Sequence, residues 1–154
     1  MKRFAFVALF GFMATAAVAE QIGSVNTTFN LLTANDKIVI EAFDDPAVSG
    51  VSCHLSRAVT GGLSGSLGLA EDKSDGSLAC RQIGPISVDL NLLKKQDGQK
   101  VFNVSTSLMF KTMQVVRFHD KKRNALVYLV YSDRMIEGSP QNAVTAIPIR
   151  PWTE

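Results

Sequence analysis

Three consecutive segments, QVVRFH (residues 114–119), DKKRN (residues 120–124) and ALVYLVY (residues 125–131), decide the fold class. The first and third are rich in β-branched and aromatic residues, which are typical of strands. The segment between them is charged and contains residue types that favour a turn. The sequence therefore predicts two strands joined by a charged turn. Because ALVYLVY is almost continuously apolar, we expect its strand to lie inside a sheet.

Other β-rich runs lie on both sides of this pair. They cover residues 37–43, 51–55, 78–83, 101–110 and 143–149. We expect Gly84-Pro85 to stop the run that begins at residue 78, and Pro148 to mark a strand end or an edge strand, because proline cannot donate a ladder hydrogen bond. Residues 88–93 indicate a short helix. The predicted fold class is mainly β, a single domain of about seven or eight mostly antiparallel strands, sandwich or barrel-like, with one or two short helices and one disulfide.

The N-terminus has the pattern of a secretory signal peptide. Lys2 and Arg3 precede an uncharged apolar run over residues 4–18, and the run closes with the small residues of Ala17-Val18-Ala19. It is shorter than the roughly 20 apolar residues of a membrane-spanning helix. We therefore expect cleavage after Ala19, a periplasmic location, and a domain over residues 20–154 with no stable membrane anchor.

Loss of this segment would change the charge balance. Lys2 and Arg3 would leave with it, so Lys plus Arg falls from 16 to 14 and equals the 14 Asp plus Glu. A neutral chain lacks the electrostatic attraction that supplies non-specific affinity for nucleic acid. The basic run at residues 121–123 then fits a solvated turn, and the composition argues against a nucleic-acid partner.

Two cysteines, Cys53 and Cys80, lie in the part that we expect to be exported, each within a short β-rich run. An oxidising compartment and an even number of cysteines favour an intramolecular disulfide. The alternatives are two free thiols or a redox-active pair, although redox catalysts usually place their cysteines in Cys-x-x-Cys. We expect the bond to join two strands across the glycine-rich residues 60–70.

Few side chains suggest chemistry. The glycine-rich loop lacks the lysine of a phosphate-binding P-loop and the frame of a serine nucleophile elbow. The candidates for a loop site are acidic and basic residues, namely Asp44, Asp45, Glu71, Asp72, Asp75, Arg117 and His119. The acids could attract a hard cation, but residues 72–76 depart from a calcium loop, and solvated turn acids are the alternative.

The histidines and the strand arginine have equally plain alternatives. His54 and His119 lack a second histidine or cysteine at zinc-ligand spacing. Arg117 alternates with apolar neighbours and either faces solvent or pairs with a buried acid. The sequence therefore identifies no catalytic residue, no metal site and no cofactor.

Several unusual strings occur in order along the chain. They are residues 41–46 (EAFDDP), 68–72 (GLAED), 115–118 (VVRF), 122–126 (KRNAL) and 137–140 (EGSP). Together they resemble the CreA family of small periplasmic proteins, and the resemblance extends from residue 22 to residue 152, both cysteines included. It implies an exported, single-domain protein of unknown molecular activity, named for a genetic locus concerned with carbon-source and envelope regulation. A protein outside the inner membrane cannot bind a promoter, so any regulatory role would be indirect.

Two functional hypotheses remain. In the first, the chain is a non-enzymatic periplasmic accessory protein that binds an envelope protein or a small ligand through loops on a disulfide-linked β scaffold. In the second, it is a cryptic hydrolase or metal-dependent enzyme in which Asp44, Asp45, Glu71, Asp72 and His119 converge in space. The sequence leaves the oligomeric state open.

Overall fold

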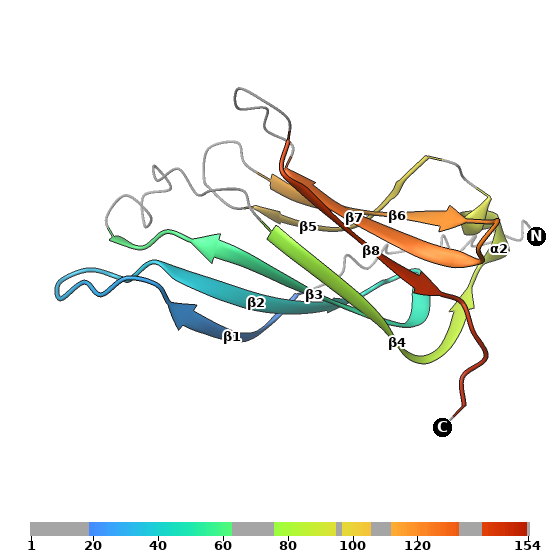
Figure 1. The fold of residues 1–154 in the computed structure, drawn as a ribbon, viewed down its shortest axis with the longest axis horizontal. Coiled ribbons are helices and arrows are strands. Elements are labelled where there is room, and N and C mark those ends of the chain that lie inside the picture. The colour runs from blue at the N-terminus through green and yellow to red at the C-terminus, as the bar shows by residue number, and fades with distance from the viewer. Residues whose placement is uncertain (1–18, 63–75, 95–96, 106–111, 133–139, 154) are drawn as a thin grey trace, which may run out of the picture.

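The computed structural model describes residues 19–62, 76–94, 97–105, 112–132 and 140–153. Within these ranges the chain forms two four-stranded antiparallel sheets, in which each strand pairs with its neighbour in sequence (Figure 1). Sheet A contains β1 (Glu20–Asn26), β2 (Lys37–Asp44), β3 (Val48–Val59) and β4 (Gly76–Val88), and sheet B contains β5 (Gln99–Ser105), β6 (Thr112–Asp120), β7 (Ala125–Ser132) and β8 (Asn142–Pro148). The prediction of a mainly β fold is confirmed.

The connection from sheet A to sheet B contains a single helical turn, α2 (Leu90–Leu93). Asp89 caps it by accepting a hydrogen bond from the backbone N–H of Asn91 at 2.8 Å, a common way to satisfy a helix N-terminus. The short helix predicted at residues 88–93 is therefore present. Across the described ranges, no helix is long and apolar enough to cross a membrane.

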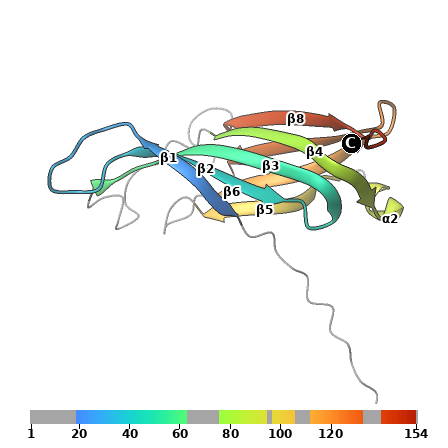
Figure 2. The ribbon, with the colours of Figure 1, turned by 90° about the horizontal axis from the view of Figure 1, so that it is seen from below.

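The core lies between the two sheets, which pack face to face (Figure 2). β4 contacts both β7 and β8 of the opposite sheet. Phe43 of β2 stacks on Phe102 of β5 with 4.3 Å between ring centroids, so an aromatic pair joins the sheets. Side chains of β7 alternate between full and partial burial, and Leu126, Tyr128 and Val130 are all fully buried. This alternation follows from the two-residue repeat of a strand.

The strand pair predicted at residues 114–131 is present. β6 and β7 pair from Met113 opposite Ser132 to Asp120 opposite Ala125, and Asn124 adopts φ 47° in the turn between them. Asparagine tolerates this left-handed conformation better than most residues. β7 lies between β6 and β8, as its apolar sequence predicts, and β8 with Pro148 is an edge strand.

One expected strand limit was wrong, and one strand was not predicted. Gly84-Pro85 does not stop the fourth strand, because β4 continues to Val88. The pair lies where the ladder between β3 and β4 shifts register, so the missing N–H of Pro85 interrupts no regular pairing. Gly50 faces it with φ +77°, and a Cβ there would lie 2.3 Å from the carbonyl oxygen of Pro85. β1 was not predicted, since its exposed residues show no alternation.

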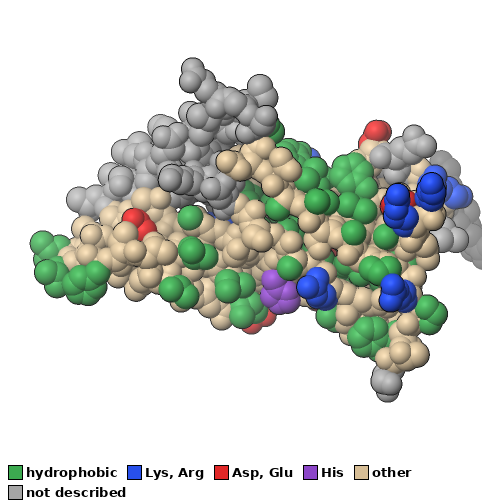
Figure 3. Space-filling view, viewed as in Figure 1, with side chains coloured by type: hydrophobic (Ala, Val, Ile, Leu, Met, Phe, Trp, Pro, Cys, Tyr) green, Lys and Arg blue, Asp and Glu red, His purple; other side chains and the backbone are tan. Residues whose placement is uncertain are grey.

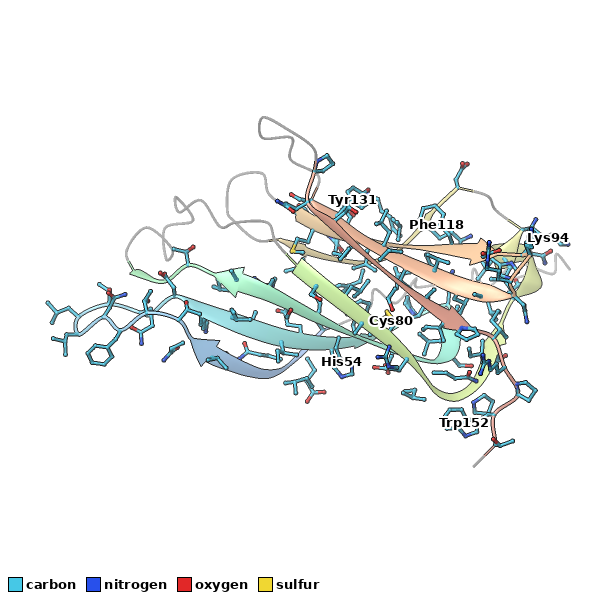
Figure 4. All side chains as sticks on the ribbon, in the orientation of Figure 1. His54, Cys80, Lys94, Phe118, Tyr131 and Trp152 are labelled. Atoms are coloured by element: carbon cyan, nitrogen blue, oxygen red, sulfur yellow. A yellow bond between two sulfur atoms is a disulfide. The ribbon has the colours of Figure 1, made fainter. Side chains whose placement is uncertain are left out.

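The predicted disulfide links Cys53 to Cys80. The two residues are directly opposite in the β3–β4 ladder, with 4.0 Å between their Cα atoms. Both are buried, and Figure 4 shows Cys80 between the sheets. The bond therefore fastens two neighbouring strands of sheet A inside the core and closes a sequence separation of 27 residues.

Candidate functional site

A buried polar network crosses the interface between the sheets. Its centre is Asp45, the first residue after β2, whose side chain is 0% exposed. One carboxylate oxygen, Oδ2, accepts hydrogen bonds from Arg117 Nη1 and from the Tyr128 hydroxyl, the latter at 2.8 Å. The other, Oδ1, accepts the backbone N–H of Ala47 at 2.9 Å. The carboxylate thus has partners on both oxygens.

The strand register of sheet B positions the partners of Asp45. Arg117 on β6 is opposite Tyr128 on β7 and opposite Gln99 on β5, so the three residues occupy adjacent positions across three strands. Arg117 also donates from Nη2 to the side-chain oxygen of Gln99 at 2.5 Å. Asp45 comes from the turn between β2 and β3 of sheet A. The network therefore connects the two sheets through charge and hydrogen bonds.

Electrostatics fixes the proton positions in this network. Burial raises the pKa of the Tyr128 phenol, and the negative charge of Asp45 raises it further. The phenol therefore stays protonated at neutral pH and donates a hydrogen bond to Asp45. Arg117, only 4% exposed, compensates the buried negative charge. A network closed in this way holds structure together and exposes no reactive group to solvent.

Asp44 and His119, the other predicted site residues within the described ranges, do not join this network. Asp44 is exposed, on the opposite face of its strand from Phe43. His119 lies on β6 two residues after Arg117, is half-buried, and has no hydrogen-bond partner among the described residues on either ring nitrogen. Its sequence neighbour Asp120 binds Arg123 instead at 2.8 Å, and this hydrogen bond lowers the pKa of the Asp120 carboxyl. No His119–Asp120 acid–base pair is formed.

Glu71, Asp72 and Asp75 lie outside the described residues, so their convergence with the other acids stays a prediction. Within the described ranges, no group of three or more His, Cys, Asp or Glu side chains is placed to hold a metal ion. Of the candidates that the structure describes, Asp45 and Arg117 are the two that come together.

The outer face of sheet A is a second feature, which sequence reasoning missed. Residues paired across an antiparallel ladder share a face. Successive rows on this face are Val25–Ile38–Ala58, then Gly23–Ile40–Ser56–Ser77, then Glu20–Ala42–His54–Ala79, and finally Asp44–Ser52–Arg81. The face is uncharged in its first two rows and contains charged residues in its last two. Val25, Ile38 and Ile40 are exposed although they are large and apolar.

This face adjoins an open hollow of about 370 Å³ near the start of β8. The lining residues come from four strands and the segment before β8: Ile38, Ser56, Arg57, Ala58, Gly76, Ser77, Gln141 and Asn142. Arg57 is held by a two-pronged ion pair, in which Nε and Nη2 each lie 2.9 Å from a carboxylate oxygen of Glu41. The hollow therefore combines an apolar wall with amide and hydroxyl groups and a fixed arginine.

Figure 3 shows hydrophobic side chains spread over the visible surface and gathered at the tip where β1 and β2 join, while charged side chains concentrate at the other end. The sequence contained a signal for the apolar outer face of sheet A, since Ile38, Ile40 and Ala42 alternate with the inward Val39 and Phe43 along β2. A strand that is apolar at successive positions presents apolar side chains on both faces. In sheet A only one of those faces meets sheet B.

Comparison with known proteins gave a consistent result. The family described as "CreA protein" matches residues 22–152. Protein CreA of Escherichia coli strain K12 is 55% identical over 139 residues, which is 90% of this chain and 88% of the relative. Protein CreA of E. coli O157:H7 gives the same identity and coverage. No solved structure matches.

Proposed function

The chain belongs to the CreA family, and we propose that it is an exported accessory protein of the cell envelope that binds a partner protein through the outer face of sheet A. The observation that carries this proposal is the row of exposed apolar side chains on that face, Val25, Ile38 and Ile40. Exposed apolar patches on small proteins commonly mark interaction sites. The hollow beside Ile38 offers a depression for one side chain of the partner.

The use of charged residues supports a binding role over a catalytic one. Asp45 and Arg117, the buried ion pair, are engaged in holding the sheets together. Glu41 and Arg57 pair with each other beside the hollow. These four residues serve structure, whereas Val25, Ile38 and Ile40 on the outer face of sheet A are exposed and free to make contacts.

Export is the second part of the proposal. The charged start, apolar run and Ala17-Val18-Ala19 end of the N-terminus have the form of a cleavable secretory signal. A disulfide is typical of proteins that mature in an oxidising compartment. We propose a periplasmic location. From the resemblance to the CreA family, we also propose a link to carbon-source or envelope regulation that acts indirectly through the partner protein.

Export is tested by N-terminal mass analysis of the protein from separated periplasmic and cytosolic fractions. We expect a chain beginning at Glu20, with Cys53 and Cys80 oxidised, in the periplasmic fraction. A cytosolic protein that retains Met1 and reacts with thiol reagents after denaturation would contradict the proposal.

Binding is tested by cross-linking and affinity capture from envelope extracts, with a variant that changes Ile38→Thr and Ile40→Thr. Threonine keeps the β-branched shape that suits a strand but removes apolar surface. The control is Val144→Thr, an exposed apolar residue on β8 of the other sheet. We expect a partner that the control captures like the wild type and that the face variant captures about tenfold less, equivalent to about 1.4 kcal/mol. Equal capture by both variants would refute the face as the binding site.

A further inference from the structure

The loop between β1 and β2, residues 27–36, ends the molecule at one extreme of its long axis, beyond the edge of sheet B (Figure 1). Three of its side chains, Phe29, Leu31 and Leu32, are 81%, 86% and 97% exposed. Residues 27–35 contain no charged residue. Single exposed apolar side chains are normal, but three within four positions on one projecting tip form a patch with no partner in the described fold.

Several hydrogen bonds join residues within the loop. The backbone N–H of Thr27 donates to the carbonyl oxygen of Asp36 at 2.8 Å, and the N–H of Asp36 donates to the Thr28 hydroxyl at 2.9 Å. The N–H of Asn30 donates to the side-chain oxygen of Asn35 at 2.6 Å. The tip is therefore shaped by internal hydrogen bonds, while its apolar side chains project outward.

Sheet A holds the loop from behind. The backbone N–H of Gly61, after β3, donates to the Asp36 carboxylate at 2.7 Å, and the N–H of Gly62 donates to the carbonyl oxygen of Ala34 at 2.8 Å. These bonds fix the tip before it meets any partner. A preformed binding element loses less conformational freedom on binding than a disordered one.

We propose that this tip docks reversibly on a lipid bilayer, with Phe29, Leu31 and Leu32 inserted among the acyl chains. Three adjoining apolar side chains suit the acyl region of a bilayer, and only these side chains enter it, so that the loop backbone remains in the hydrated headgroup region. A stable protein interface instead buries at least about 1,000 Å², which three side chains on a projecting tip are poorly built to supply.

The charges around the tip specify the kind of lipid surface. The nearest charged residues in the sequence are Asp36 and Lys37, which have opposite signs. No basic cluster is therefore available in the loop for attraction to anionic lipids. Insertion depends on apolar burial, so it occurs on bilayers with zwitterionic headgroups and is insensitive to salt. The tip residues differ from Val25, Ile38 and Ile40 of the adjoining outer face, and their docking on lipid does not require the partner protein proposed for that face.

The first experiment is co-sedimentation with phosphatidylcholine vesicles, using the protein in the form to which cells process it. The test variant is Phe29→Ser/Leu31→Ser/Leu32→Ser, and the control Ile83→Ser/Val144→Ser removes exposed apolar side chains elsewhere. We expect the vesicle partition coefficient of the test variant to fall at least about tenfold, with the control unchanged. Binding should persist when salt is raised from about 0.05 to 0.5 M, because screening weakens only electrostatic attraction.

The second experiment locates the contact. Leu31→Trp is made in a Trp152→Phe background, and its fluorescence is compared with that of the wild type, whose Trp152 lies near the C-terminus, away from the tip (Figure 4). We expect vesicles to shift the emission of the indole introduced at the tip to shorter wavelength and to leave Trp152 emission in the wild type unchanged.

Three results would each overturn the proposal. The first two are absence of vesicle binding by the wild type and an unshifted emission from the tip indole. Light scattering that finds a wild-type dimer lost in the triple serine variant would also overturn it, because the tip would then contact a second copy of the chain.

Discussion

The Asp45 network gives the sharpest prediction of stability. Asp45→Asn keeps the side-chain shape but removes the negative charge and one acceptor oxygen, so a single amide oxygen cannot accept from the Arg117–Tyr128 side and from the Ala47 N–H at once. Breaking a buried ion pair by changing one partner costs about 3–5 kcal/mol. We expect about 3 kcal/mol, the lower limit, because asparagine retains one acceptor. This is a large fraction of the roughly 5–15 kcal/mol that stabilises a domain of ordinary size.

The assay is urea unfolding of the oxidised protein. With a denaturant slope of about 2 kcal/mol per molar, a loss of this size lowers the unfolding midpoint by roughly 1.5 M. Arg117→Met should cost a similar amount, since it leaves the Asp45 carboxylate buried without its cation. The double variant should be more stable than the sum of the single effects predicts by at least about 1 kcal/mol, because the second change removes a charge that the first left unpaired.

Asp120→Asn provides the matched control. It also removes the carboxylate of an Asp–Arg pair, but its partner Arg123 is largely exposed. Exposed ion pairs contribute little to stability, so the midpoint should change little. If Asp45→Asn costs no more than this control, or if the Asp45 and Arg117 effects add without coupling, the network does not hold the sheets together and the reasoning is wrong.

Three further predictions concern the disulfide, one glycine and one tyrosine. Changing Cys53 and Cys80 together to alanine should lower the free energy of unfolding by about 3.5 kcal/mol in the chain-entropy description of a 27-residue loop, as measured by urea unfolding beside the wild type. Gly50→Ala should cost about 1–3 kcal/mol because of its positive φ and close backbone contact, whereas Gly23→Ala, with open space around the new Cβ, should cost far less; equal thermal shifts would contradict this. Because the folded state raises the pKa of Tyr128, its contribution is complete below the usual tyrosine pKa of about 10 and is lost as pH rises above it, by about 1.4 kcal/mol per pH unit. Tyr128→Phe should remove this alkaline decline, and an unchanged pH profile in that variant would refute the assignment.

The strands were largely predictable because most of them carry short-range signals. β-branched and aromatic runs indicate β2, β6 and β7. The charged turn before Ala125 indicates where β6 ends and β7 begins. The same local rules failed at Pro85, where β4 continues through an irregular pairing. Whether a proline ends a strand depends on the pairing of the strand opposite, and no local pattern contains that information.

The site was less predictable than the strands. Arg117 between Val116 and Phe118 indicated a choice between solvent and a buried acid, but the sequence could not name Asp45, which lies 72 residues away. Tyr128 belongs to an apolar run that predicts a buried strand, and nothing in that run indicates that its hydroxyl completes the network. Such partners are set by sheet-to-sheet packing, a long-range property. The exposed apolar tip was missed for the opposite reason, since apolar residues are assigned to a core unless a structure shows otherwise.

The two ends of sheet A differ in structure, so the stabilising role of Asp45 and the proposed docking role of the tip can be tested separately. Near the β2–β3 turn, Asp45 and Phe43 join the sheets by charge and aromatic stacking. At the β1–β2 tip, the sheet extends beyond sheet B, and Leu31 and Leu32 project from it. Substitutions at Asp45 should therefore lower the free energy of unfolding. Serine at the tip should weaken binding to vesicles and leave the free energy of unfolding unchanged within about 0.5 kcal/mol. A tip variant that unfolded as easily as Asp45→Asn would show that these side chains stabilise the fold, and their exposure would no longer argue for a docking site.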